Sequence, residues 1–191
     1  MFTRLDSDHK HVSRRSSVYA RNVVAASQPL AAQAGVQILR NGGNAVDAAI
    51  ATAITLTVVE PTMNGIGSDA FVIVSDNHGI HGFNGSGRSP AAWTPERFAG
   101  HDNMPEHGWD TVTVPGAVDT WVQLSDRFGQ LPFEKLFDSA INYAAQGFAV
   151  SPVIAAGWAR AAEEFGYLEG FRTIFMPNGR APTAGEAFQS E

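Results

Sequence analysis

Two glycine-containing loops carry the residues best suited to chemistry. The first is Glu60-Pro-Thr-Met-Asn-Gly-Ile-Gly-Ser-Asp69, which places a hydroxyl and a carboxylate beside turns at Gly65 and Gly67. The second is Phe83-Asn-Gly-Ser-Gly-Arg-Ser-Pro90, in which Arg88 stands among small residues. A guanidinium on a short, rigid loop suits bidentate binding of a carboxylate. For the first loop, a tight structural turn is the favoured interpretation. For the second loop, a surface arginine on a turn is at least as open an interpretation as a binding residue.

The other polar residues do not form a familiar catalytic set. Asp69 is either a functional acid or an acid that stabilises its own turn. A serine nucleophile needs an adjacent base, and none is identified by spacing for Ser68, Ser86 or Ser89. We expect His78 and His81 to be exposed hairpin residues, and we predict no metal site. The four tryptophans, Trp93, Trp109, Trp121 and Trp158, are interpreted as core or interface anchors.

Two helices are expected before the first loop. Ser27 is a candidate cap for a helix that has Pro29 in its first turn and ends at Gly42-Gly43. Asn44 then caps a second helix, which has Asp47 near its positive end. This second helix carries a face of alanines small enough for close packing, and we expect it to be buried and central: Ala45, Ala48, Ala49, Ala51 and Ala53.

The rest of the chain alternates turns with short periodic segments. Residues 71–75 and 80–83 flank a turn and predict a hairpin. Helical spacing is found in three further segments, 117–128, 133–145 and about 152–165, and the tail from Met176 is rich in turns. The pattern predicts a helix-rich α+β protein, with a polar arm at 1–17 and one fold from 18 to 191.

Composition excludes several classes of function. The chain has 191 residues, a formal net charge of −6 and no cysteine. The acidic balance argues against a nucleic-acid partner, and the lack of cysteine excludes disulfides and thiolate catalysis within this sequence. The first residues lack the apolar run of a secretory signal, and the run Ala45–Val59 is too short to span a bilayer. We therefore expect a cytoplasmic protein with no membrane partner.

A series of segments resembles the amino-terminal part of the γ-glutamyltranspeptidase family. The most specific match is Gly-Gly-Asn-Ala-Val-Asp-Ala-Ala at 42–49, and it is followed by Asn-Gly-Ile-Gly-Ser-Asp-Ala-Phe at 64–71. Val-Thr-Val-Pro-Gly-Ala-Val at 112–118 and Ala-Ala-Gln-Gly-Phe at 144–148 follow in the same order. The resemblance extends over about residues 18–188, which is nearly the whole chain.

The resemblance implies an N-terminal-nucleophile hydrolase with an αββα sandwich, of which this chain is the helix-rich N-terminal portion. In such enzymes a precursor cleaves itself before a threonine, and the free amine of that threonine activates its own hydroxyl. This chemistry needs no metal or organic cofactor. The threonine is expected outside this chain, on a small subunit or C-terminal remainder that is its partner, so the chain alone should contain no catalytic residue. The substrate implied is a small γ-glutamyl or related acyl amide.

The second loop departs from the family pattern. Transpeptidases that act on glutathione have Phe-Arg-Glu-x-Ala-Pro here, and the arginine grips the α-carboxylate of the glutamyl group. Aligned on Phe83, the arginine position falls on Asn84, whereas aligned on Pro90 it falls near Ser86. Arg88 is displaced along the loop in both alignments. We name Arg88 and Asn84 as the candidate substrate-binding residues. The departure is similar to the divergent transpeptidase-like or cephalosporin-acylase-like branch of the family.

Two other classes of protein are alternatives to an amidohydrolase. A homologue that keeps the fold but only binds or supports a partner is compatible with the sequence. A dinucleotide-binding enzyme requires a strand, then glycines, then a helix, because the phosphate sits on the helix N-terminus. Here the order around Gly65 is helix, glycines, strand, which argues against it.

Overall fold

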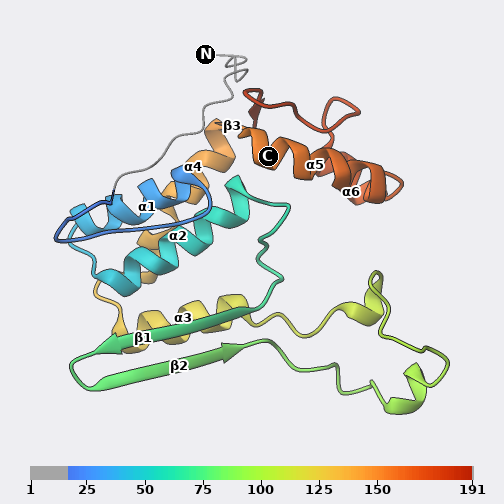
Figure 1. Ribbon diagram of the computed structural model, residues 1–191, viewed down its shortest axis with the longest axis horizontal. Coiled ribbons are helices and arrows are strands. Elements are labelled where there is room, and N and C mark those ends of the chain that lie inside the picture. The colour runs from blue at the N-terminus through green and yellow to red at the C-terminus, as the bar shows by residue number, and fades with distance from the viewer. Residues whose placement is uncertain (1–16, 191) are drawn as a thin grey trace. The chain divides into compact units, whose positions relative to one another are not determined.

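The computed structural model describes residues 17–190, which form helices and short two-stranded sheets, and the predicted α+β class is confirmed (Figure 1). The arm predicted for residues 1–17 lies, apart from Ser17, outside the described residues. The chain forms two compact units. The first comprises the chain up to Gly65 together with the chain from Gly129 onward, and the second is Ile66–Phe128.

The first unit is built mainly from helices. They are α1 (Pro29–Arg40), α2 (Ala45–Val59), α4 (Asp138–Gln146), α5 (Pro152–Phe165) and α6 (Glu169–Phe175), with a 3₁₀ helix at Phe133–Phe137 that leads into α4. Two short strands, β3 (Phe148–Ala149) and β4 (Ala187–Phe188), pair antiparallel. Between residues 17 and 190 there is no helix with the length and apolar character needed to cross a membrane.

The residue that caps α1 lies one position after the predicted cap. Its N-cap is Gln28, whose side-chain oxygen accepts from the backbone N–H of Leu30. The Ser27 hydroxyl instead donates to the carboxylate of Glu60 at the end of α2. The prediction that Ser27 caps the helix was therefore wrong, because a partner distant in sequence takes the hydroxyl.

Helix α2 lies against α1 in Figure 1, and a glycine makes the contact close. A methyl group added to Gly35 of α1 would come within 2.4 Å of the Thr52 Oγ1 atom in α2. The predicted alanine face of α2 is confirmed only in part. Ala48 and Ala51 are buried as expected, whereas Ala45 and Ala49 are exposed. The prediction of close packing was therefore wrong at Ala45 and Ala49.

The N-terminus of α2 is held by a capping box. The Asn44 side chain accepts from the backbone N–H groups of Val46 and Asp47, and the Asp47 carboxylate accepts from the N–H of Asn44 at 2.9 Å. Asp47 is fully buried. The same carboxylate accepts from the backbone N–H of Gln130 at 3.1 Å and of Leu131 at 3.3 Å. One side chain therefore fixes both the start of α2 and a loop far away in sequence.

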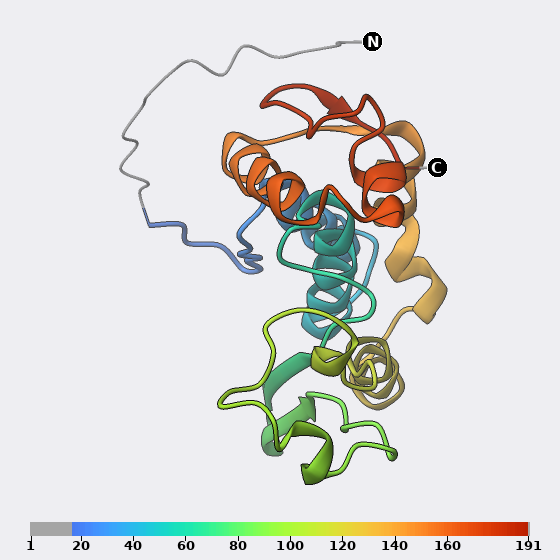
Figure 2. The same cartoon turned by 90° about the vertical axis from the view of Figure 1, so that its right-hand side faces the viewer.

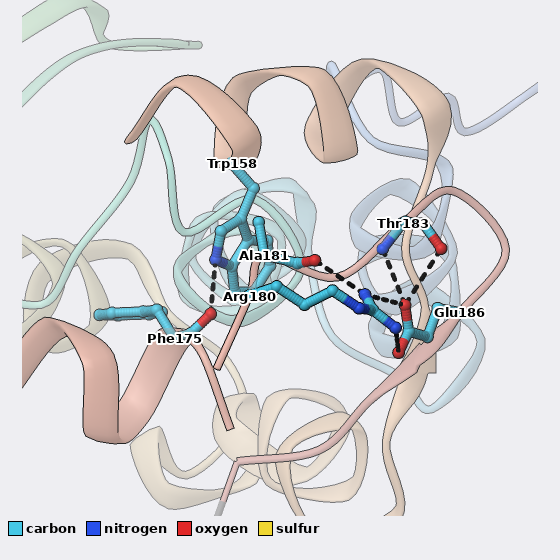
Figure 3. A network of polar contacts seen from close by, with 6 residues as sticks. All are labelled: Trp158, Phe175, Arg180, Ala181, Thr183 and Glu186. Atoms are coloured by element: carbon cyan, nitrogen blue, oxygen red, sulfur yellow. Dashed lines mark hydrogen bonds and ion pairs between the residues drawn. The ribbon is translucent and has the colours of Figure 1, made fainter. Parts of the chain in front are cut away.

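The core of the first unit forms around Trp158 of α5. Its ring packs edge-on against Phe188 of β4, with ring centroids 4.7 Å apart. Its indole N–H donates to the Phe175 carbonyl at 2.9 Å (Figure 3). Ala31 of α1 and Val59 of α2 belong to the same cluster. The helix predicted from Pro152 to Phe165 is confirmed, but α6 was not predicted.

An ion pair fastens the loop between α6 and β4. Arg180 donates two hydrogen bonds to the Glu186 carboxylate, at 2.9 and 3.1 Å, and the backbone N–H and hydroxyl of Thr183 donate to the same group (Figure 3). The hydrogen bonds from Arg180 and from the Thr183 backbone lower the pKa of Glu186 from its ordinary 4.5 to about 2. The loop therefore depends on an ionised Glu186.

The second unit is a hairpin with one helix. Strands β1 (Ala70–Asp76) and β2 (Gly79–Gly85) pair antiparallel, and α3 (Ala117–Phe128) contacts β2. The predicted hairpin and the predicted helix at 117–128 are both confirmed. Between β2 and α3 the chain makes a long excursion, drawn in green to yellow-green in Figures 1 and 2, with 3₁₀ turns at Pro95–Phe98 and Trp109–Thr111.

Replacing Asp47 by alanine should destabilise the protein by roughly 2 to 4 kcal/mol, because buried backbone N–H groups lose their acceptor. Urea unfolding followed by circular dichroism measures the loss. Asp126→Ala is the control, since Asp126 is an exposed acid on α3, and it should change stability by less than about 0.5 kcal/mol. Equal effects of the two substitutions would contradict the role given to Asp47.

The Glu186 ion pair should make stability depend on pH in acid. Because the pKa of Glu186 is lowered on folding to about 2, its contribution is complete above 4.5 and is lost as pH falls toward 2. Glu186→Gln should therefore be less stable than the unmodified protein at pH 6. The difference should shrink below pH 4.5 in thermal unfolding measured across the range. A difference independent of pH would argue against the ionised pair.

Candidate functional site

The glycine loop between α2 and β1 begins at Glu60. The Glu60 carbonyl accepts from the backbone N–H of Met63 at 3.2 Å and of Asn64 at 3.1 Å, which forms the first turn of the loop. Its carboxylate is nearly buried and takes the Ser27 hydroxyl. The loop continues into the second unit at Ile66, so its two halves belong to different units.

The segment that leaves β2 carries both candidate binding residues. Asn84 pairs with Phe71 of β1, and its side-chain oxygen accepts from the backbone N–H of Ser86 at 3.0 Å. This bond turns the chain out of the strand. Asn84 is exposed, but one side of its amide is already used locally. The structure places it on the same segment as Arg88, and no hydrogen bond joins the two side chains.

Three glycines bring this segment against the residues that precede α3. A methyl group on Gly116 would come within 2.1 Å of the Gly85 carbonyl oxygen, and one on Gly85 within 1.9 Å of the Thr120 Oγ1 atom. Gly87 has a φ of +75°, and a methyl group there would lie 1.8 Å from the Val114 carbonyl oxygen. We call Gly85, Gly87 and Gly116 the glycine seam. Backbone contacts this close exclude any side chain.

Backbone hydrogen bonds reinforce the glycine seam. The carbonyl of Ser68 accepts from Gly116 at 3.1 Å and from Ala117 at 3.0 Å. The carbonyl of Arg88 accepts from Val114 at 2.9 Å. Sequence reasoning matched Val112–Val118 to a family but gave it no role. The Pro-Gly pair immediately before a helix was the available signal, yet its partner segment was visible only in three dimensions.

The backbone of Arg88 is held by a hydrogen bond, whereas its side chain is exposed to solvent. The residue is exposed, and its guanidinium forms no hydrogen bond or ion pair with any residue between 17 and 190. The other arginines of the second unit are engaged: Arg97 with Asp110, and Arg127 with His81. The site therefore presents one uncommitted cation on a fixed backbone, which can bind an anion such as a carboxylate.

His81 differs from the exposed hairpin residue that was expected. It is partly buried; its Nε2 lies 3.2 Å from an Asp76 carboxylate oxygen, and its Nδ1 lies 3.0 Å from the Arg127 Nη2. The first of the causes that lower the pKa of Asp76 is the backbone N–H of His78, and His81 adds to it. Arg127 on α3 supplies the contact that hairpin spacing could not reveal. His78 is exposed as predicted.

The described residues supply no catalytic machinery of their own. The Ser86 hydroxyl contacts only the neighbouring Gly87 carbonyl, at 3.5 Å, and no base. Asp69, immediately before β1, is exposed. Among residues 17–190 no three His, Asp or Glu side chains lie close enough together to hold a metal ion. The arrangement can bind and orient an anionic ligand, but it offers no activated nucleophile.

A profile of the family described as Gamma-glutamyltranspeptidase matches residues 31–191. Two curated relatives carry names of processed enzymes. The chain is 35% identical over 177 residues to the glutathione hydrolase-like YwrD proenzyme of Bacillus subtilis, and 34% identical over 181 residues to the oxamate amidohydrolase proenzyme of Klebsiella pneumoniae. Each alignment covers 91% of this chain and 34% of the relative. The chain thus spans about one third of these relatives.

Solved structures similar to this chain are also larger enzymes of which the chain matches only a part. A cephalosporin acylase from Bacillus halodurans superposes with a TM-score of 0.89 at 45% identity, covering 97% of this chain and 36% of that one. A γ-glutamyltranspeptidase from Helicobacter pylori superposes with a TM-score of 0.85 at 26% identity, covering 92% of this chain and 52% of that one.

Gly87→Ala should destabilise the second unit by at least about 1 kcal/mol, because alanine is strained at positive φ and its methyl group meets the Val114 carbonyl. Chemical denaturation of the purified protein measures the change. Gly82→Ala is the matched control in the adjacent strand. A methyl group there meets nothing within 4 Å, so it should be neutral or slightly stabilising. Similar losses for both would show that the glycine seam is not close-packed.

Proposed function

This chain belongs to the γ-glutamyltranspeptidase family, and we propose that it is part of an amidohydrolase or acyltransferase that cleaves γ-glutamyl or related acyl amides. The predicted fold class is confirmed by the family structures: the chain is the N-terminal portion of an N-terminal-nucleophile hydrolase. The observation that supports the activity most strongly is the family match over residues 31–191, together with relatives named as hydrolase, amidohydrolase and acylase.

The proposed nucleophile is the N-terminal threonine of a second chain, released by self-cleavage of a longer precursor. Its hydroxyl attacks the amide carbonyl while its own amine takes the proton. The amine then gives this proton to the departing nitrogen as the C–N bond breaks, which leaves an acyl-enzyme that passes the acyl group to water or to an amine. The printed names of the relatives as proenzymes support processing. Within this division, the present chain supplies scaffold and substrate binding.

The proposed substrate carries a carboxylate on its acyl side. A γ-glutamyl group and oxamate, which the names of the relatives point to, both have one. Arg88 is suited to bind this carboxylate because its guanidinium is unpaired among residues 17–190 and its backbone is held by Val114 and the glycine seam. No acid of residues 17–190 pairs with Arg88, which argues against the alternative of a surface arginine held by a neighbouring acid. Asn84 is a weaker candidate, since its side chain serves Ser86.

The complete proenzyme tests the proposal. Its mass, measured before and after denaturation, should resolve into two chains if self-cleavage takes place. The processed protein should hydrolyse a γ-glutamyl anilide, whereas the 191-residue chain alone should not, because it lacks the nucleophile. A complete protein that stays unprocessed and inactive would support the reading of a non-catalytic homologue instead.

Arg88→Lys should weaken turnover of carboxylate-bearing amides by roughly 1 to 3 kcal/mol in kcat/KM, because lysine loses the bidentate geometry. Turnover of simple acyl amides should be spared. Arg160→Lys serves as the control, since Arg160 is an exposed arginine on α5 in the other unit. If both substrate classes fall together, or neither changes, Arg88 does not select the substrate.

A further inference from the structure

The excursion formed by residues 89–113 leaves and returns at one point. At its base the carbonyl of Arg88 accepts from the Val114 N–H at 2.9 Å, and the Thr113 hydroxyl donates to the Ser86 carbonyl at 3.3 Å. Gly87 and Val114 are also in close backbone contact at this base. Loops of this length are uncommon in folded domains and are usually either functional or disordered linker segments. Because its ends are joined, the excursion is a separate projection from the hairpin and α3.

Internal contacts fix the shape of the excursion. Arg97, in its first 3₁₀ turn, donates from Nε at 2.8 Å and from Nη2 at 2.6 Å to one carboxylate oxygen of Asp110 in the second turn. The rings of Trp93 and Phe98 pack edge-on with centroids 5.5 Å apart. Thus the turn that carries Asp110 is tied to the rest of the excursion.

This second turn presents a tryptophan to solvent. Trp109 is 86% exposed, although Gly108 before it takes a φ of +95° and Asp110 after it is held by Arg97. The Thr111 N–H and hydroxyl both donate to the Gly108 carbonyl, which closes the turn. A tryptophan held on a fixed backbone with an exposed ring is typical of the residues that dominate binding energy in protein interfaces.

We propose that Trp109 anchors the excursion in a pocket of the part of the proenzyme that lies outside this chain. The chain spans 34% of its curated relatives, so most of the protein that can receive the ring lies beyond these residues. Asp102 and Glu106, exposed acids of the excursion, fit an apolar pocket with a basic rim. Because the base of the excursion is bonded to Arg88, docking also holds the backbone of Arg88 relative to that part.

The inference rests on the proposed function only in taking the chain as part of a longer proenzyme. Two variants of the complete protein, Trp109→Cys and Gly100→Cys, are labelled with a maleimide and followed by mass. The 191 residues contain no cysteine. Labelling of the unmodified complete protein therefore measures the cysteines that lie outside these residues, and this background is subtracted. Gly100 is matched because it lies on the same excursion and a side chain there meets nothing within 4 Å. We expect at least ten-fold slower labelling of the Trp109→Cys protein.

Cysteine lacks the ring, so a photo-cross-linking variant, Trp109→benzoylphenylalanine, decides the matter if the two labelling rates are equal. We expect a cross-link to a peptide from outside residues 1–191 that persists on dilution. A cross-link to a second copy, or equal labelling with no cross-link to the remainder, overturns the inference. Amidase activity is measured in parallel: a cross-linked but inactive protein contradicts only the proposed function, and an active protein without docking contradicts only the inference.

Discussion

The buried carboxylate of Asp47 is the contact on which the first unit depends. A buried carboxylate is costly unless hydrogen-bond donors surround it. Here the donors found among residues 17–190 are all backbone N–H groups. Those groups belong to Asn44, Gln130 and Leu131, so the same side chain sets the first turn of α2 and the entry of the chain into residues 129–191. Helix α2 then supplies the surface for α1, for the 3₁₀ helix before α4 and, through Val59, for the cluster around Trp158.

In the second unit, close packing depends on the absence of side chains, whereas the first unit depends on the side chain of Asp47. At Gly85, Gly87 and Gly116 the backbone of one segment fills the space that a Cβ would take on the other. A seam of this kind leaves its flanking side chains pointing to solvent, and Arg88 is one of them. The cost is conformational entropy, because glycine loses more freedom on folding than any other residue. The gain is a backbone position that does not depend on a side-chain rotamer.

Much of this could be predicted from local pattern. The cap at Asn44, the hairpin and the helix at 117–128 follow from residue types within a few positions of each other, and all three are confirmed. What the sequence could not reveal were contacts between residues far apart in the chain. The Ser27 hydroxyl donates to Glu60, His81 contacts Arg127, and Asp47 accepts from the backbone of residues 130 and 131 in addition to its predicted place in the first turn of α2. Arg88 and Asn84 could be named as candidates from their loop, but the backbone bond to Val114 joins segments whose pairing no local spacing specifies.

The two constraints together support the proposed role of this chain in binding substrate and not in the reaction itself. Bidentate recognition of a carboxylate requires the guanidinium within a few tenths of an ångström of its place, and a long, flexible side chain reaches that accuracy only from a fixed backbone. The glycine seam provides the fixed backbone for Arg88, and no acid of residues 17–190 competes for the charge. A nucleophile makes a different demand, a base within hydrogen-bond reach, which a self-processed threonine meets with its own amine. Binding and reaction can therefore reside on separate segments of one family fold, and the described residues carry the features of the first.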